Sequence, residues 1–255
     1  MRHRFTLFFT ILLLLFIFPA QLLAAPPTLS ATSAILVDKD SGFVFYELNS
    51  HKKLSVASTT KIITGILVLE YGDMEDVVVT SQNAADAGGS ELYLDPGEGR
   101  TVDELIYALL LRSANDAAVA LAEYIAGSVK DFTVLMNRKA KLVGANSTQF
   151  TNPHGLHDEN FSTAYDLSLI ARYCLENEKF SEIVATKKRT IPWPGNPYPR
   201  ELLNHNKLLL KYPKATGIKT GYTKKAGYCL VSSAREGNRT LIAVVLNSSS
   251  SNACY

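Results

Sequence analysis

The sequence predicts one α+β domain whose antiparallel sheet is built from strands at both ends of the chain. Three observations lead to this prediction. A β-rich strand pair follows an N-terminal leader, helical patterns fill the middle, and strand patterns return near the C-terminus. No internal repeat interrupts this order, and low complexity is confined to residues 248–251. Without the leader about 230 residues remain, enough to bury a sizeable core.

The first 25 residues have the pattern of a signal peptide. Arg2 and Arg4 precede an apolar core at residues 5–19, and the small residues Ala24 and Ala25 offer a cleavage site. An uncleaved membrane anchor is the alternative, and either one predicts an exported protein. We therefore expect a signal peptide at residues 1–25 and a single domain at residues 26–255.

Charge and cysteine content exclude several protein classes. The chain has 26 Lys and Arg residues against 24 Asp and Glu residues, and the leader removes two arginines but no acid. The remaining chain has no net basic field to recruit nucleic acid. After the leader, no apolar run is long enough to span a membrane. Cys174, Cys229 and Cys254 are too few for a disulfide framework, and we expect the first two to be buried without a bridge.

The N-terminal third begins with two expected strands, at residues 33–37 and 43–46, around a turn at residues 40–42. A helical pattern follows from about residue 57 and ends near Gly72, a residue typical of helix C-termini. Residues 73–100 are polar and rich in glycine, which predicts turns and short strands.

The middle of the chain contains helices with recognisable start signals. Thr101 and Glu104 form a capping box that opens a helix at residues 105–111. Further helices are expected at the following ranges: 115–125, 130–142 and 163–175. Residues 190–200 contain four prolines and are expected to be irregular. Strand patterns at residues 217–221, 228–234 and 240–246 complete the sheet.

Ser58 and Lys61 lie three residues apart at the start of an apolar helix, so their side chains share one face. A serine hydroxyl is a poor nucleophile unless a neighbour accepts its proton. A lysine accepts a proton only when burial or nearby positive charge lowers its pKa. This S-x-x-K pair predicts a nucleophile and its base, although the pattern also recurs by chance.

Two further motifs are weak when taken singly. Ser113 and Asn115 lie at a junction between helices, where such residues usually cap a helix. Lys219, Thr220 and Gly221 offer a cation, a hydroxyl and room for a ligand, but they also fit an exposed strand end. In the order S-x-x-K, S-x-N and K-T-G, the three motifs form a set found in penicillin-binding proteins and β-lactamases.

Longer segments extend this resemblance from about residue 33 to residue 247. The chain resembles the low-molecular-mass penicillin-binding proteins, the serine-type D-alanyl-D-alanine carboxypeptidases. The matching segments are ASTTK (57–61), LLLRSANDAAVALAEYIAGS (109–128), FTNPHGL (150–156), STAYDLSLIA (162–171) and GIKTGYTKKAGYCLVSSA (217–234). The resemblance implies a β-lactamase/transpeptidase-like fold, with a helical subdomain beside the sheet.

The resemblance also implies roles for the motif residues. Ser58 would be acylated by peptidoglycan stem peptides ending in D-Ala-D-Ala, and by β-lactam antibiotics, after Lys61 takes its proton. Ser113 and Asn115 would complete the proton path and position the peptide. Lys219 and Thr220, next to Gly221, would hold the terminal carboxylate. The backbone N–H groups of Ser58 and Tyr222 would form the oxyanion hole. No cofactor or metal is implied.

The chain departs from the family pattern in three places. Val56 stands where proline is common, and Thr216 where aspartate is common. Family members usually continue into a C-terminal helix that covers the sheet, and many add a β-rich domain and a membrane anchor. Here we expect the covering helix to be missing from a truncated chain. Membrane association is therefore left open, and the expected location is the cell wall, the periplasm or the outer face of the cytoplasmic membrane.

Three alternatives stay open at this point. A class A β-lactamase shares the motifs, but its deacylating E-x-x-x-N element is not found between the second and third motifs. A catalytically impaired penicillin-recognising module would fail to react with a labelled penicillin. A metalloenzyme could use His154 and His157, although no third ligand is evident.

Overall fold

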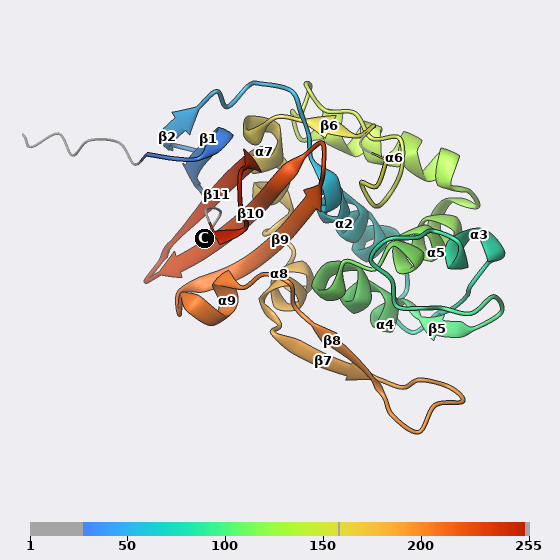
Figure 1. Cartoon of the computed structure of the whole chain (residues 1–255). Helices are drawn as coiled ribbons and strands as arrows, with labels where there is room; N and C mark the ends of the chain where they lie inside the picture. Colours follow the sequence, from blue (N-terminus) through green and yellow to red (C-terminus); the bar gives the residue numbers. More distant parts are fainter. Residues whose placement is uncertain (1–27, 158, 253–255) are drawn as a thin grey trace, which may run out of the picture.

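The computed structural model describes residues 28–157 and 159–252. Its largest sheet has five antiparallel strands in the order β2-β1-β11-β10-β9 (Figure 1). The strands are β1 (Ala31–Asp38), β2 (Val44–Leu48), β9 (Ala215–Thr223), β10 (Gly227–Glu236) and β11 (Arg239–Ser248). β1 pairs with β11, so the two ends of the described chain lie side by side. The α+β fold with a sheet from both ends of the chain is confirmed.

The register of the sheet separates two faces. Ile35, Val244 and Val231 occupy one register row and are fully buried on the face toward the helices. Such β-branched residues suit a buried pleated surface. On the opposite face, Leu36 and Val245 remain partly exposed.

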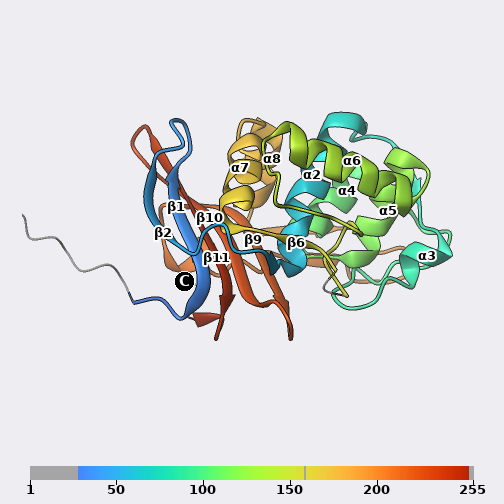
Figure 2. The same ribbon diagram turned by 90° about the horizontal axis from the view of Figure 1, so that it is seen from above.

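Helices cover one face of the sheet and form a second body of structure beside it (Figure 2). α7 packs on β1 and β11, α8 packs on β9, and α2 lies among the other helices. The helical elements are η1 (Ala57–Thr60), α2 (Lys61–Tyr71), α3 (Gln82–Ala85), α4 (Val102–Tyr107), η2 (Ala108–Arg112), α5 (Asn115–Ala126), α6 (Val129–Leu142), α7 (Ala164–Cys174), α8 (Glu178–Ala185) and α9 (Leu208–Lys211).

The start signals of two helices work as expected. The Thr101 hydroxyl accepts a hydrogen bond from the Glu104 backbone N–H, and Glu104 accepts one in return from the Thr101 N–H. The Thr163 hydroxyl accepts from the Asp166 N–H at the start of α7. These contacts satisfy backbone donors that have no partner inside the helix.

Three short two-stranded sheets complete the fold. They pair β3 (Leu54–Ser55) with β6 (Phe161–Ser162), β4 (Val77–Val79) with β5 (Gly99–Thr101), and β7 (Lys188–Ile191) with β8 (Arg200–Leu203).

The structure corrects the sequence-based assignment in several places. The helix expected at residues 105–111 is α4 followed by the π-helical turn η2, and the short helices α3 and α9 were not predicted. The expected irregular stretch 190–200 is flanked and partly occupied by the β7–β8 hairpin, and its four prolines lie in the connecting loop, where no ladder hydrogen bond is required. α8 was not predicted, although Asn177 caps it by accepting the Phe180 N–H, and Phe180, Ile183 and Val184 are buried.

Several other expectations concern burial and the chain ends. Cys174 and Cys229 are both buried, as expected for small apolar side chains. The predicted leader at residues 1–25 and Cys254 lie outside the described residues. Within residues 28–157 and 159–252, no helix combines the length and apolar character needed to cross a membrane.

Candidate active site

Ser58 lies in η1, the short 3₁₀ turn that leads into α2. Thr59 tightens this turn, because its N–H and hydroxyl both donate to the Val56 carbonyl. Ala57, just before Ser58, has a left-handed backbone with φ of 46°. Such strained conformations persist only where surrounding structure holds them. The turn leaves Ser58 partly exposed at the edge of a cavity.

Lys61 is completely buried one helical turn after Ser58. Its Nζ lies 3.2 Å from Ser58 Oγ, 2.6 Å from Asn115 Oδ1 and 2.8 Å from the His154 carbonyl oxygen. These three oxygens come from η1, α5 and the loop before β6. Three separate parts of the fold therefore fix the position of this nitrogen.

The environment of Lys61 favours a neutral amine. Desolvation lowers the pKa of Lys61 well below its ordinary value, and the nearby positive charge of Lys219 lowers it further. Asp116 acts in the opposite direction with a smaller effect. When Lys61 is unprotonated, its lone pair can accept the proton of the Ser58 hydroxyl across the 3.2 Å contact.

Ser113 and Asn115 face the same site from the junction between η2 and α5. Ser113 ends the π-helical turn η2 with φ of 66°, and its Oγ is buried without a hydrogen-bond partner among the described residues. Asn115 takes part in three hydrogen bonds. Its Oδ1 accepts from Lys61, its Nδ2 donates to the Gly88 carbonyl, and its N–H donates to the Ser90 carbonyl. A buried, unpartnered hydroxyl is costly to maintain and suggests a functional role.

The loop containing the segment FTNPHGL is hydrogen-bonded to the start of α2, next to Lys61. Thr64 Oγ1 donates to the Pro153 carbonyl, and Asn160 Nδ2 donates to Thr60 Oγ1, which ties the loop to α2. Gly155 is required at the closest approach, because a Cβ there would lie 1.9 Å from the Ala57 carbonyl oxygen. The loop thus places the His154 carbonyl next to the lysine.

Strand β9 forms the opposite wall of the site. Lys219 is buried, with 1% of its surface exposed, and its Nζ donates to the Thr220 carbonyl at 3.0 Å. Desolvation lowers the pKa of Lys219 to about 7. Gly221 allows β9 to approach η1, because a Cβ there would meet the Ser58 nitrogen at 2.9 Å. Tyr222, next along the strand, is 55% exposed and stacks on Tyr228.

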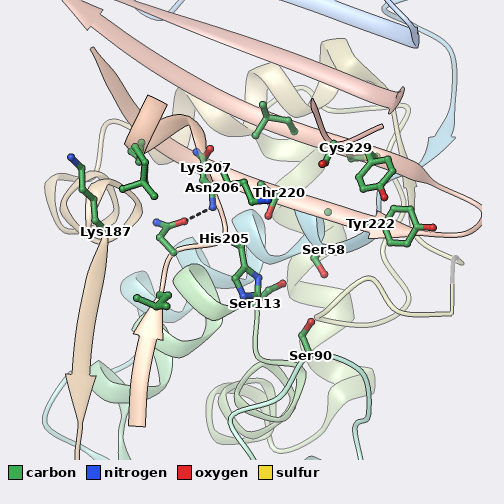
Figure 3. Close-up of a pocket in the computed structure, with 18 of the residues that line it drawn as sticks. Ser58, Ser90, Ser113, Lys187, His205, Asn206, Lys207, Thr220, Tyr222 and Cys229 are labelled. Atoms are coloured by element: carbon green, nitrogen blue, oxygen red, sulfur yellow. Dashed lines mark hydrogen bonds between the residues drawn. The ribbon is translucent and has the colours of Figure 1, made fainter. Parts of the chain in front are cut away.

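A cavity of about 750 Å³ opens between these walls (Figure 3). Its lining includes Ser58, Ser113, Thr220, Gly221 and Tyr222. Lys61 contacts Ser58 behind this lining, and Asn115 in turn contacts Lys61. The three sequence motifs, separated by more than 50 residues each, therefore converge on one cavity, as the sequence predicted. The eight predicted site residues all lie at this place, but their chemical roles remain a proposal.

Two residues at the site were not anticipated from the sequence. Asp116 is buried, and its carboxylate accepts the N–H groups of Leu92 and Leu94, which fixes the loop that follows the cavity-lining Ser90. His205 lines the cavity and is tethered through its N–H to the Leu111 carbonyl. Asp116 follows a motif residue and could have been noticed as an acid on a buried helix. Nothing in the sequence marked His205.

The histidine pair considered for metal binding is arranged differently from a metal site. The buried His154 ring accepts the Leu156 N–H through Nδ1, while His157 is exposed. Desolvation lowers the pKa of His154 to about 3. Within the described part of the chain, no group of three or more metal-ligating side chains gathers.

Comparison with known proteins places this geometry in a family. A family model described as D-alanyl-D-alanine carboxypeptidase (peptidase S11) matches residues 20–250. The chain belongs to this family. The D-alanyl-D-alanine carboxypeptidase DacF of Bacillus subtilis is 42% identical over 232 residues, a match that covers 86% of this chain and 58% of the relative. The chain thus spans little more than half the length of that relative.

Solved structures of similar proteins have the same fold. The crystal structure of the D-alanyl-D-alanine carboxypeptidase DacD from Francisella tularensis matches with a TM-score of 0.84 at 31% identity, over 90% of this chain and 68% of that chain. A mutant of Streptomyces K15 DD-transpeptidase matches with a TM-score of 0.84 at 33% identity, over 89% of this chain and 94% of that chain. This chain therefore has the same fold as these carboxypeptidase and transpeptidase structures.

Proposed function

We propose that this chain is a serine-type D-alanyl-D-alanine carboxypeptidase that removes the terminal D-alanine from peptidoglycan stem peptides. One observation carries the proposal more than any other. A fully buried lysine nitrogen lies 3.2 Å from a serine hydroxyl that opens into a cavity. The family membership and the names of the relatives support the same reaction.

The proposed first step is acylation of Ser58. Neutral Lys61 takes the hydroxyl proton while Ser58 Oγ attacks the carbonyl carbon of the penultimate D-alanine. The backbone N–H groups of Ser58 and Tyr222 would stabilise the developing oxyanion. The peptide bond then breaks, and the leaving D-alanine nitrogen receives a proton from Lys61 through Ser113. The orphaned Ser113 hydroxyl supports this relay.

The second proposed step is hydrolysis of the acyl-enzyme. Water attacks the ester carbon, its proton passes to Lys61, and Ser58 Oγ leaves and recovers a proton. Asn115 would hold Lys61 through its Oδ1 and orient the peptide during both steps. The proposed cycle draws on side chains and backbone N–H groups of this chain and on water.

Substrate recognition is assigned to β9. Protonated Lys219 and the Thr220 hydroxyl would bind the carboxylate of the terminal D-alanine, because charge-assisted hydrogen bonds suit a carboxylate. The absence of a side chain at Gly221 lets the strand and the nucleophile flank the same peptide. β-Lactams carry a comparable carboxylate beside a reactive amide, so they would acylate Ser58 as well.

The setting of the reaction is part of this proposal. Residues 1–25 would direct export and residues 26–255 would form the catalytic domain, acting outside the cytoplasm on the cell wall. No contact in the described residues favours a β-lactamase, a non-catalytic module or a metalloenzyme over this function.

Mass spectrometry after penicillin treatment tests the proposal. We expect the intact protein to gain one penicillin mass on the peptide that contains Ser58, and to release D-alanine from a peptide ending in D-Ala-D-Ala. The Ser58→Ala variant should lose both activities, whereas Ser41→Ala, in the β1–β2 turn, should keep them. Labelling of the Ser58→Ala variant at another residue would refute the assignment.

A further inference from the structure

The cavity continues beyond Thr220, away from Ser58, into a region bordered by lysines. Lys187 precedes β7, Lys188 begins it, and Lys207 precedes α9, and all three line the cavity. Figure 3 shows Ser58 and Tyr222 toward one end and Lys187 at the other, with Thr220 and His205 between them. We call the part lined by Lys187, Lys188, His205 and Lys207 the basic extension.

The charge of the basic extension is only partly balanced. Lys188 pairs with Glu201 on the neighbouring strand, whereas Lys187 and Lys207 are exposed and form no ion pair within the described residues. No Asp or Glu is among the described residues that line the cavity. The buried Lys219 lies behind its wall and adds to the positive potential when it is protonated.

His205 is sensitive to this potential. Desolvation lowers the pKa of His205 to about 4. Three cations also contribute to the shift: Lys219, Arg112 and Lys61. The imidazole is therefore neutral near pH 7, so the unbalanced charge of the basic extension comes from Lys187 and Lys207.

We propose that the basic extension makes Lys187 and Lys207 specificity residues that direct the acyl-enzyme to water and away from amine acceptors. This inference rests on the proposed function. After D-alanine leaves, the next nucleophile must approach the ester carbon through the space that the D-alanine occupied. In the proposed binding mode that space lies beside Thr220 and opens into the basic extension.

The two competing nucleophiles differ in charge before they reach the ester carbon. In hydrolysis a C–O bond forms, the Ser58 Oγ–C bond breaks, water gives a proton to Lys61, and Ser58 Oγ recovers a proton. In aminolysis a C–N bond forms as the same ester bond breaks, the attacking nitrogen likewise gives a proton to Lys61, and Ser58 Oγ recovers one. An amine acceptor in water is mainly a cation, so positive potential lowers its concentration beside the ester, whereas neutral water is unaffected.

A partition experiment tests this inference. The enzyme is given a peptide ending in D-Ala-D-Ala together with Nα-acetyl-lysine amide, a cationic amine acceptor, and both products are quantified by mass spectrometry. Lys187→Glu combined with Lys207→Glu should raise the ratio of transfer to hydrolysis about threefold at 0.1 M salt. The neutral pair Lys187→Gln and Lys207→Gln should give an intermediate ratio.

A matched control separates local from global charge. Lys130→Glu combined with Lys141→Glu makes the same change of net charge at two exposed positions of α6. Neither position lines the cavity. This variant should keep the wild-type ratio. Raising the salt concentration should reduce the difference in transfer ratio between the cavity variants and wild type. The Debye screening length is about 10 Å at 0.1 M salt and becomes shorter as salt is added, which weakens the effect of the lysines on the acceptor.

The outcomes are distinguishable from those of the proposed function. An unchanged transfer ratio in both cavity variants, while D-alanine is still released, would overturn the inference and leave the carboxypeptidase proposal standing. An equal rise in the α6 control would also overturn it. Failure of the wild-type protein to release D-alanine at all would overturn both.

Discussion

The two walls of the cavity each bury a lysine, but they hold it differently. On the helical wall, Lys61 contacts three oxygens from three parts of the fold. On the sheet wall, Lys219 Nζ donates to the carbonyl of the next residue, Thr220. Burial lowers both pKa values, and the pKa of Lys219 stays near 7. In the proposed mechanism, the same residue type at the same depth thus supplies a fixed proton acceptor on one wall and an available cation on the other.

The largest effect is expected from replacing Lys61, which tests its role as the proton acceptor on the helical wall. Lys61→Met keeps the length and burial of the side chain but removes the proton acceptor, so the acylation rate should fall about 10³-fold. The rate is measured with a fluorescent penicillin under single-turnover conditions. The free energy of unfolding should fall by about 1–3 kcal/mol, because Asn115 Oδ1 and the His154 carbonyl lose their buried donor. If a folded Lys61→Met variant were labelled by the fluorescent penicillin at the wild-type rate, Lys61 could not be the proton acceptor.

The corresponding change on the sheet wall should have a smaller and substrate-dependent effect. Lys219→Met removes one charge-assisted hydrogen bond to a carboxylate, a loss of about 2 kcal/mol. We therefore expect kcat/KM to fall about thirtyfold for a peptide with a free C-terminal carboxylate. The matched peptide with a C-terminal amide should lose much less. Equal losses for the two peptides would show that Lys219 does not recognise the carboxylate.

How far the sequence predicts this molecule depends on the range of the interactions. The capping box at Thr101 and the S-x-x-K spacing at Ser58 are local, and both are found where expected. The contact between Lys61 and Asn115 spans 54 positions, and only the known order of family motifs indicated it. The α+β fold with a terminal sheet followed from strand patterns at the two ends.

What the sequence could not predict depends on tertiary packing. His205 lies in the cavity because its backbone bonds to Leu111, almost a hundred residues earlier, and no local pattern encodes that contact. The β7–β8 hairpin was obscured by the prolines of its loop. The orphaned hydroxyl of Ser113 is visible only when its surroundings are known.

A pH profile sharpens the comparison between the two lysines. Activity on a free-carboxylate peptide requires Lys61 unprotonated and Lys219 protonated, so kcat/KM should fall in acid as Lys61 gains a proton. It should also fall above about pH 7, where Lys219 loses its proton, by about tenfold per unit. The amidated peptide should retain the acid limb and lose most of the alkaline limb. An identical alkaline limb for both peptides would assign that limb to another group.

The smallest expected effect tests how the helical wall is kept in place. Asp116→Asn weakens the buried hydrogen bonds to the Leu92 and Leu94 N–H groups, so the free energy of unfolding should fall by about 1–3 kcal/mol. The loop that follows the cavity-lining Ser90 should become less ordered, and KM should rise about threefold with little change in the single-turnover acylation rate at saturating penicillin. Asp131→Asn, the same change near the exposed start of α6, should leave both KM and stability close to wild type. If Asp116→Asn instead slowed acylation as strongly as Lys61→Met, Asp116 would act on the lysine itself and not through the loop.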